Sequence, residues 1–180
     1  MLEKINRFLQ GVIFYVTVLA VASITSAHSQ VSTIIVPGVS IVVPETFKQL
    51  SDDDIKLKWF NTRNPPLKAF GNSTGATTIS FSIGNLDISR KDYEQFSLEL
   101  EKGLASPSNK IFKREIISIN GKNWILIETE STAIDTTIHN LLLVTSLRDK
   151  MLGVNFNSTV LEFKTYQDRL LKSMKTLKIH

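Results

Sequence analysis

The second half of the chain alternates apolar and polar residues in the manner of antiparallel strands. Residues 116–119 and 124–127 flank Asn120-Gly121. Asn and Gly tolerate the positive φ angles of a type I′ turn, so this stretch predicts a β-hairpin. The unbroken apolar run within residues 137–145 predicts a central strand covered on both faces, and the alternation over residues 152–156 predicts a further antiparallel strand.

Shorter strand patterns lie near the two ends of the chain. The β-branched residues at 39–43 stop at Pro44, and the apolar residues at 79, 81 and 83 alternate with serines, so both stretches predict strands. Residues 176–179 predict a short edge strand.

Two long helices are predicted by apolar residues spaced three and four apart. The first, over residues 89–104, opens with Ser89 and Asp92 at capping-box spacing, and the last, ending at Met174, opens with Thr159 and Glu162. The expected buried stripes are Tyr93, Phe96, Leu100 and Leu104 in the first helix, and Phe163, Tyr166, Leu170 and Met174 in the second.

A run of three acids, residues 52–54, follows Ser51. A serine and acids at this position are typical of a helix start, where exposed backbone amides and the helix dipole favour oxygen and negative charge. Carboxylates also suit Ca²⁺, but the spacing lacks the Gly and the Glu of an EF-hand loop. We therefore interpret the run as the start of a short helix.

These elements predict an α+β domain: a single antiparallel β-sheet flanked by helices on both faces. We expect residues 1–27 to be a signal peptide, residues 28–37 a flexible segment, and residues 38–180 one folded domain.

The first 27 residues have the parts of a secretory leader. Lys4 and Arg7 precede an apolar run over residues 8–22, and small side chains precede a cleavage site between Ala27 and His28. The alternative is an uncleaved membrane anchor, although the run is shorter than the roughly 20 residues that span a bilayer. The prediction is a periplasmic or secreted domain that meets a membrane only through an uncleaved leader.

Composition and charge narrow the class of protein. Hydrophobic residues make up 42% of the chain and charged residues 21%, as in globular domains. Zero Cys excludes disulfides, thiolate metal sites, a Cys nucleophile and lipid attachment at Cys. Without the leader the net charge is about +3, which is too small to indicate a nucleic-acid-binding protein. The basic residues also do not alternate with aromatic residues in the pattern that stacks on bases. No Gly-rich phosphate loop is present, so no nucleotide or other cofactor is predicted.

No catalytic or metal-binding constellation is visible in the sequence. His28 and His180 lie at predicted chain ends, and His139 shares a strand face with leucines, which favours a structural histidine without a paired acid. Glu128 and Glu130 share a strand face and could form a glycosidase pair, but we favour the interpretation that they lie on an exposed face of an antiparallel sheet.

The segment after the short helix is the candidate for contact with a protein partner. It contains Trp59, Phe60, Arg63, Pro65 and Pro66. Trp and Arg are enriched at binding hot spots, and rigid prolines lower the cost of ordering a loop. The alternative is that both aromatics pack beneath the loop.

Three triplets match glycosylation acceptors. Residues 72–74 and 157–159 fit the N-glycosylation pattern, and Asp135-Thr136-Thr137 is similar to the acceptor of some bacterial O-glycosylation systems.

A family resemblance adds to these observations. The chain resembles the PsbP-like superfamily in the order of its elements and in a few residues. These are the strand that ends at Pro44-Glu45, Phe47, the helix after Ile88-Ser89, the Ile119-Asn120-Gly121 hairpin and the late strand-helix-strand order. That superfamily includes PsbP, the Ran-binding Mog-type proteins and the DcrB-like lipoproteins. The resemblance implies an α/β/α sandwich and a non-enzymatic binding or assembly module. This chain departs from the lipoproteins because it has no Cys after the leader.

Two classes of function follow. The first is an exported binding or assembly module that acts through an unidentified protein partner, of which an immunity or chaperone-like protein is a variant. The second is a small exported hydrolase. The missing triad and metal cluster favour the first class.

Overall fold

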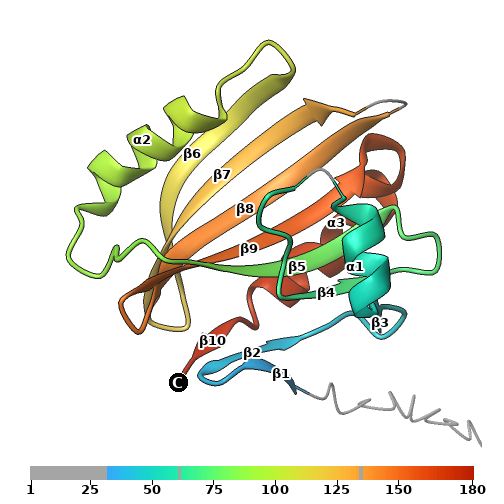
Figure 1. The fold of residues 1–180 in the computed structure, drawn as a ribbon, viewed down its shortest axis with the longest axis horizontal. Helices are drawn as coiled ribbons and strands as arrows, with labels where there is room; N and C mark the ends of the chain where they lie inside the picture. Colours follow the sequence, from blue (N-terminus) through green and yellow to red (C-terminus); the bar gives the residue numbers. More distant parts are fainter. Residues whose placement is uncertain (1–31, 61, 134–135) are drawn as a thin grey trace, which may run out of the picture.

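The computed structural model describes residues 32–60, 62–133 and 136–180. Within this part of the chain the strands form two antiparallel sheets, a seven-stranded one in the order β3-β4-β5-β9-β8-β7-β6 and a three-stranded one in the order β1-β2-β10 (Figure 1). The large sheet consists of β3 (Lys48–Gln49), β4 (Lys68–Gly71), β5 (Thr77–Gly84), β6 (Asn109–Ile119), β7 (Lys122–Thr132), β8 (Thr137–Leu147) and β9 (Lys150–Thr159). The small sheet consists of β1 (Ser32–Val36), β2 (Val39–Val42) and β10 (Lys178–Ile179), and the helices are α1 (Asp52–Lys58), α2 (Tyr93–Leu104) and α3 (Val160–Met174).

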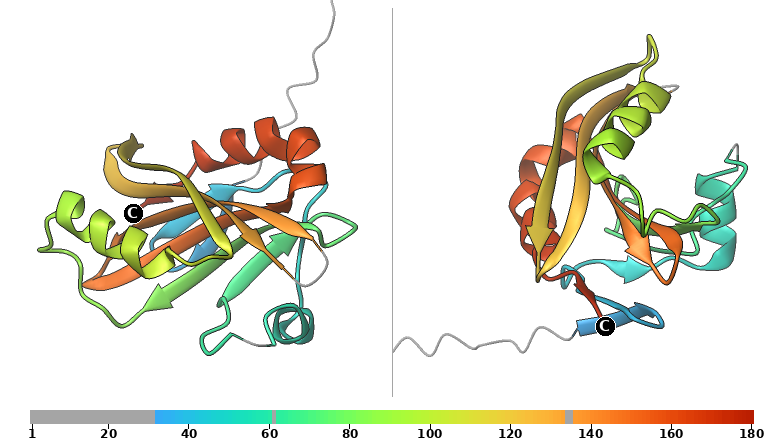
Figure 2. Two further views of the ribbon diagram at one scale, coloured as in Figure 1. Left: turned by 90° about the horizontal axis from the view of Figure 1, so that it is seen from above. Right: turned by 90° about the vertical axis from the view of Figure 1, so that its left-hand side faces the viewer.

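Helices cover both faces of the large sheet, as predicted. Figure 2 shows α3 on one side of the sheet and α2 on the other. Leu170 of α3 is fully buried in the main core, which also contains Phe81 and Phe156 from the sheet. Phe96 of α2 packs in a second cluster, over the opposite faces of β7 and β8. The strand β8 lies between β7 and β9, which confirms its predicted central position.

The prediction of a single sheet is wrong in one respect, because the terminal strands form their own sheet. β10 pairs with β2, with Lys178 opposite Ser40. The end of β2 bonds to α3 instead of joining the large sheet: the Val42 amide donates to Thr176 Oγ1 at 2.8 Å, and Ser173 Oγ donates to the Val42 carbonyl at 2.6 Å.

The predicted flexible segment 28–37 is wrong for its second half. Ser32–Val36 forms β1 and pairs with β2. The two strands are joined at Pro37-Gly38, where Gly38 adopts φ +93°, a conformation that L side chains disfavour. β-branched residues before such a turn are typical of a hairpin strand. Residues 28–31 lie outside the described part of the chain.

The first and last helix starts follow the predicted capping chemistry to different degrees. Ser51 Oγ accepts from the Asp54 amide at 3.1 Å and the Asp54 carboxylate accepts from the Ser51 amide at 3.2 Å, so the acidic run starts a helix. Thr159 accepts from the Glu162 amide at 3.3 Å. The Glu162 carboxylate does not complete that capping box, because it binds side chains of the β4–β5 region.

The predicted start of α2 at Ser89 is wrong. The helix begins at Tyr93, and the Asp92 carboxylate accepts from the amides of Glu94 and Gln95. The Ser89 hydroxyl instead donates to Asp87 at 2.7 Å, which satisfies Asp87 outside the helix. Both Asp and Ser are good N-cap residues, so the sequence alone did not separate the two positions.

The Asn-Gly hairpin is confirmed. Asn120 and Gly121 have φ angles of +50° and +79°, and Ile117 lies opposite Trp124. Its strands are much longer than predicted, and a register irregularity lies between Ile111 and Lys113. No helix in the described ranges is long and apolar enough to cross a membrane.

Candidate functional site

The residues predicted to contact a partner follow α1, a short helix beside β3 and β4 (Figure 1). Trp59 ends α1 and is half-buried, with Lys58 Nζ 5.6 Å from its ring centre. Phe60 is 70% exposed, and Arg63 and Pro65 are exposed, whereas Pro66 is buried. The interpretation that both aromatics pack beneath the loop is therefore wrong for Phe60.

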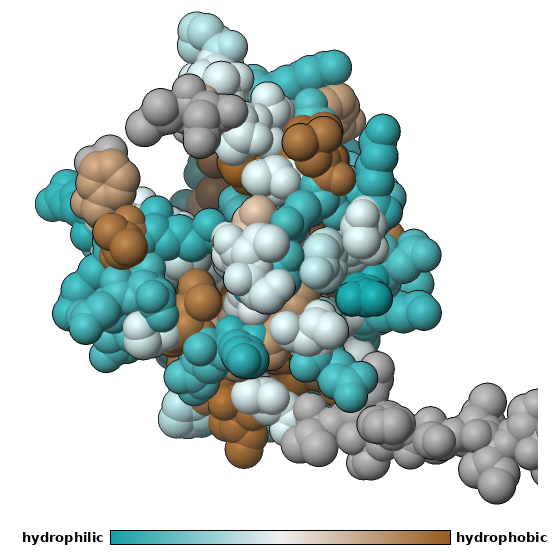
Figure 3. All heavy atoms as spheres, turned by 90° about the vertical axis from the view of Figure 1, so that its right-hand side faces the viewer, coloured by the Kyte–Doolittle hydropathy of each residue, from teal (hydrophilic) through white to brown (hydrophobic). Residues whose placement is uncertain are grey.

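Two further apolar side chains, one on each side of this segment in the chain, are exposed. Leu57 and Leu67 are 76% and 59% exposed. We call Leu57, Phe60 and Leu67 the α1 surface. Ile55 is the buried residue of α1, so the helix turns most of its side chains to solvent. Figure 3 views the molecule from the side where α1 lies and shows isolated apolar side chains that project among hydrophilic ones.

His139 has paired acids, contrary to the sequence interpretation. Its Nε2 lies 2.9 Å from Glu128 Oε1 and its Nδ1 lies 3.4 Å from Glu130 Oε1. The ring is buried and stacks on Phe163 at 3.8 Å between ring centres, with Phe112 at 6.1 Å. The two carboxylates are thus half-buried and turned towards α3, and they do not form a free exposed face.

This cluster does not have the geometry of a hydrolytic centre. Both nitrogens of His139 face carboxylates, and in the described ranges no hydroxyl bonds to the ring. A general base needs a nucleophile or water within hydrogen-bond reach. In the same part of the chain no three acids, histidines or cysteines converge as metal ligands.

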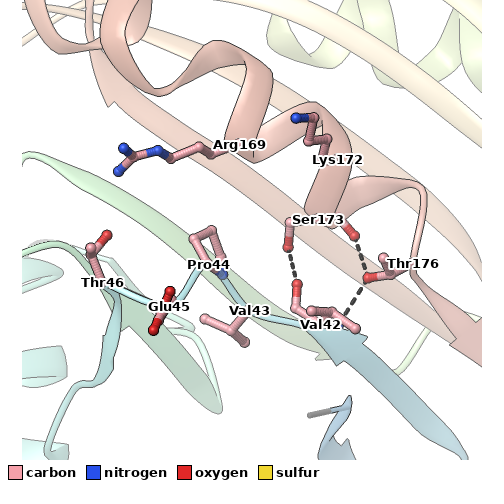
Figure 4. Close-up of a pocket in the computed structure, with 9 residues that line it drawn as sticks. All are labelled: Val42, Val43, Pro44, Glu45, Thr46, Arg169, Lys172, Ser173 and Thr176. Carbon is pink, nitrogen blue, oxygen red and sulfur yellow. Dashed lines mark hydrogen bonds between the residues drawn. The ribbon is translucent and has the colours of Figure 1, made fainter. Parts of the chain in front are cut away.

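One cavity lies between the end of β2 and α3, and has a volume of about 300 Å³ (Figure 4). Arg169 and Lys172 line it, but Figure 4 shows their charged groups pointing in different directions. Ser173 and Thr176 use their hydroxyls in bonds within the protein. The cavity therefore lacks a convergent set of polar groups.

A second cavity, of about 260 Å³, lies between α3 and strands β6, β7 and β8. Six apolar side chains line it: Ile117, Leu126, Leu141, Phe163, Leu171 and Met174. Its polar lining consists of Lys113, Glu115, Glu128 and Gln167. Glu128 connects the cavity to His139. The sequence showed Glu128 but not the cavity, because the cavity depends on where α3 crosses the sheet.

The structure describes the asparagines of both predicted N-glycosylation triplets. Asn72 donates its amide to Glu162 at 2.7 Å, and Asn157 donates its amide to Asn140 at 2.9 Å, so both N-glycosylation triplets have engaged amides. Asp135, Ala27 and His28 lie outside the described residues.

Comparisons with known proteins address the fold. The chain matches no family model, and no curated protein sequence matches it. Several solved structures are similar to this chain, and three of them are covered over most of their length. Cyanobacterial PsbP (CyanoP) from Synechocystis has 11% identity and a TM-score of 0.56, with 89% of this chain and 99% of that chain covered. LpqN of Mycobacterium tuberculosis, involved in cell envelope biogenesis, has 13% identity and a TM-score of 0.56, with 83% and 89% covered. PA94 of Pseudomonas aeruginosa, of unknown function, has 11% identity and a TM-score of 0.53, with 83% and 96% covered.

At these identities the similarity bears on architecture alone. The element order and the antiparallel sheet with helices on both faces agree with it. The resemblance seen in the sequence is thereby confirmed at the level of structure: this chain has the PsbP-like fold.

Proposed function

We propose that this chain is an exported, non-enzymatic binding or assembly module that acts through a protein partner docking on the α1 surface. The observation that carries the proposal is the exposure of Leu57, Phe60 and Leu67, each more than half accessible to solvent. Similarity to LpqN, which is involved in cell envelope biogenesis, supports a location outside the cytoplasm, as do the leader-like first 27 residues.

The chemistry of the α1 surface fits a protein interface. Scattered exposed apolar residues are normal, but Leu57 and Phe60 lie three positions apart in the chain, one in the last turn of α1 and one directly after the helix. Arg63 and Pro65 are exposed beside them in the chain. An aromatic anchor with a neighbouring Arg is a common composition for a binding hot spot.

The His139 cluster supports a non-enzymatic role. Carboxylate oxygens lie 2.9 and 3.4 Å from the two ring nitrogens, and Phe163 stacks on the ring. A hydrolase would need the ring free to take a proton from a nucleophile.

The proposal is tested by site-specific photo-crosslinking in the native host. A photoreactive phenylalanine analogue at position 60 should capture one dominant protein. The matched control is position 161, since Leu161 is 87% exposed but lies on α3, away from the α1 surface. Capture of the same protein from both positions, or from neither, would count against the α1 surface.

The captured partner then permits a quantitative test. Phe60→Ser should weaken binding of the purified partner by more than tenfold, whereas Leu161→Ser should leave it unchanged. Both side chains are exposed, so the free energy of unfolding should change by less than about 0.5 kcal/mol in either variant. Arg63→Glu should weaken binding as well, through the lost charge.

A further inference from the structure

The second cavity is large enough for a small organic ligand. Its volume is about 260 Å³, and a dry apolar cavity of about 150 Å³ already binds benzene. Leu126, Leu141 and Met174 are buried at its floor, and Lys113 and Gln167 are exposed at its rim. The floor therefore offers apolar contact, and the exposed rim is the side from which a ligand can enter.

One carboxylate in the lining is held in a fixed position. Glu128 Oε1 accepts from His139 at 2.9 Å, and His139 is itself buried and stacked on Phe163. Among the described residues no group donates to the other oxygen of Glu128. A preorganised acceptor costs little to align with a ligand.

The charges around the cavity leave an excess of negative charge. The lining contains one ammonium, of Lys113, and two carboxylates, of Glu115 and Glu128. Lys113 Nζ pairs with Glu115 at 2.8 Å and lies on the strand position opposite Glu128, so one ammonium serves both carboxylates. Outside the lining, Glu130 contacts His139 and lies opposite Lys110 on the neighbouring strand. A cation would offset the remaining charge beside an apolar floor, where few waters screen the interaction.

We propose that this cavity binds a small organic amine, with the apolar part against Leu126, Leu141 and Leu171 and the protonated nitrogen donating to the free oxygen of Glu128. A neutral ligand of the same shape leaves that oxygen without its charged donor, and an organic acid is repelled by it. The site is separate from the α1 surface and does not depend on the proposed protein partner.

The test is a titration of the full-length, ¹⁵N-labelled chain with benzylamine and with its neutral isostere, benzyl alcohol, followed by NMR at pH 7. Benzylamine should shift the amide signals of residues that line the cavity, with a dissociation constant on the order of 1 mM, an ordinary affinity for a ligand of this size. Benzyl alcohol should bind roughly 10- to 100-fold more weakly, because a hydrogen bond to a charged group is lost.

A matched pair of variants tests which carboxylate binds the protonated nitrogen of the ligand. Glu128→Gln should weaken benzylamine by at least tenfold, whereas Glu130→Gln should leave its affinity within about threefold, because Glu130 bonds to the same histidine but does not line the cavity. Equal affinity for amine and alcohol, shifts confined to other regions, no shift at 20 mM benzylamine, or equal losses in the two variants would each overturn the proposal. If Glu128→Gln fails to fold, the comparison of amine with alcohol on the unaltered chain decides it.

Discussion

At the scale of single residues, Glu162 joins two parts of the fold through three side-chain partners. Its carboxylate accepts from Thr77 at 2.6 Å, from Thr74 at 2.7 Å and from Asn72 at 2.7 Å, which connects the first turn of α3 to the β4–β5 region. Burial raises the pKa of Glu162, but the three hydrogen bonds outweigh it and hold the pKa below the ordinary value of 4.5. The ionised carboxylate is therefore the form that stabilises the fold.

Replacing this carboxylate should change how stability depends on pH. Because the pKa of Glu162 is lowered on folding, its contribution is complete above pH 4.5 and is lost as the pH falls through the lower folded pKa. Glu162→Gln should cost about 1 kcal/mol at pH 7, since solvent screens a partly exposed carboxylate. Urea unfolding of both proteins at pH 7 and at pH 3 measures this. A difference that stays constant at the two pH values would contradict the assignment.

His139 shows the limit of prediction at this scale. The sequence placed Glu128 and Glu130 on one strand face and His139 on another strand, but the contact requires the register that sets Glu130 opposite His139. The hairpin pattern was defined only over residues 116–127, so the register between this strand and the one containing His139 was open. A shift of one residue reverses every side chain, and no local signal chose the right one. The exposure of Phe60 could not be predicted from the sequence either, because it depends on how α1 packs.

At the scale of elements, α3 has one face in the core and one in solvent. Leu170 is fully buried and Leu161 is 87% exposed. Leu170→Ala should lower the free energy of unfolding by about 3 kcal/mol, through lost transfer energy and a residual cavity. Leu161→Ala should change it by less than about 0.5 kcal/mol. Denaturant unfolding of the two variants tests the orientation of α3, and similar losses in both would show that the helix is rotated.

Two glycines should respond to alanine with opposite signs. Gly103 lies in α2 and an added Cβ meets no atom within 4 Å, so Gly103→Ala should stabilise the protein by roughly 0.5–1 kcal/mol. Gly121 also has open space but adopts φ +79°, so Gly121→Ala should cost about 1 kcal/mol. Thermal melts of the two variants provide the measurement. A stabilising Gly121→Ala would rule out the type I′ turn.

The elements that could be predicted from the sequence are those whose stabilising contacts join residues close together in the chain. The Asn-Gly hairpin and the caps at Ser51 and Thr159 each depend on residues within a few positions of one another, and all three are present. The strands β1, β3 and β4 were missed because short strands derive their stability from neighbours distant in the sequence. The division into two sheets depends on pairing across most of the chain, from β2 to β10.

At the scale of the whole molecule, the small sheet joins the two ends of the described chain. β1 and β2 pair near the start, and β10 adds to β2 from the end. His180 Nε2 lies 2.9 Å from Ser40 Oγ, and the Asn120 side chain donates to the carbonyls of Lys175 and Leu177 at 3.0 and 2.8 Å. The end of α3, the hairpin turn and the first strands therefore stabilise one another. In the part of the chain that the structure describes, strand pairing begins at Ser32.

This position of β1 makes removal of the leader compatible with the fold. Cleavage after Ala27 would leave residues 28–31 before β1 and would remove none of the described strand pairs. We therefore expect the protein isolated from its native host to have the intact mass of residues 28–180 and to be found in the periplasmic or secreted fraction. An Ala27→Asp variant, in which a charged side chain occupies the small-residue position of the cleavage site, should accumulate uncleaved. A full-length mass in the membrane fraction of the unaltered protein would instead identify residues 8–22 as a retained anchor, and the α1 surface would then act close to a membrane.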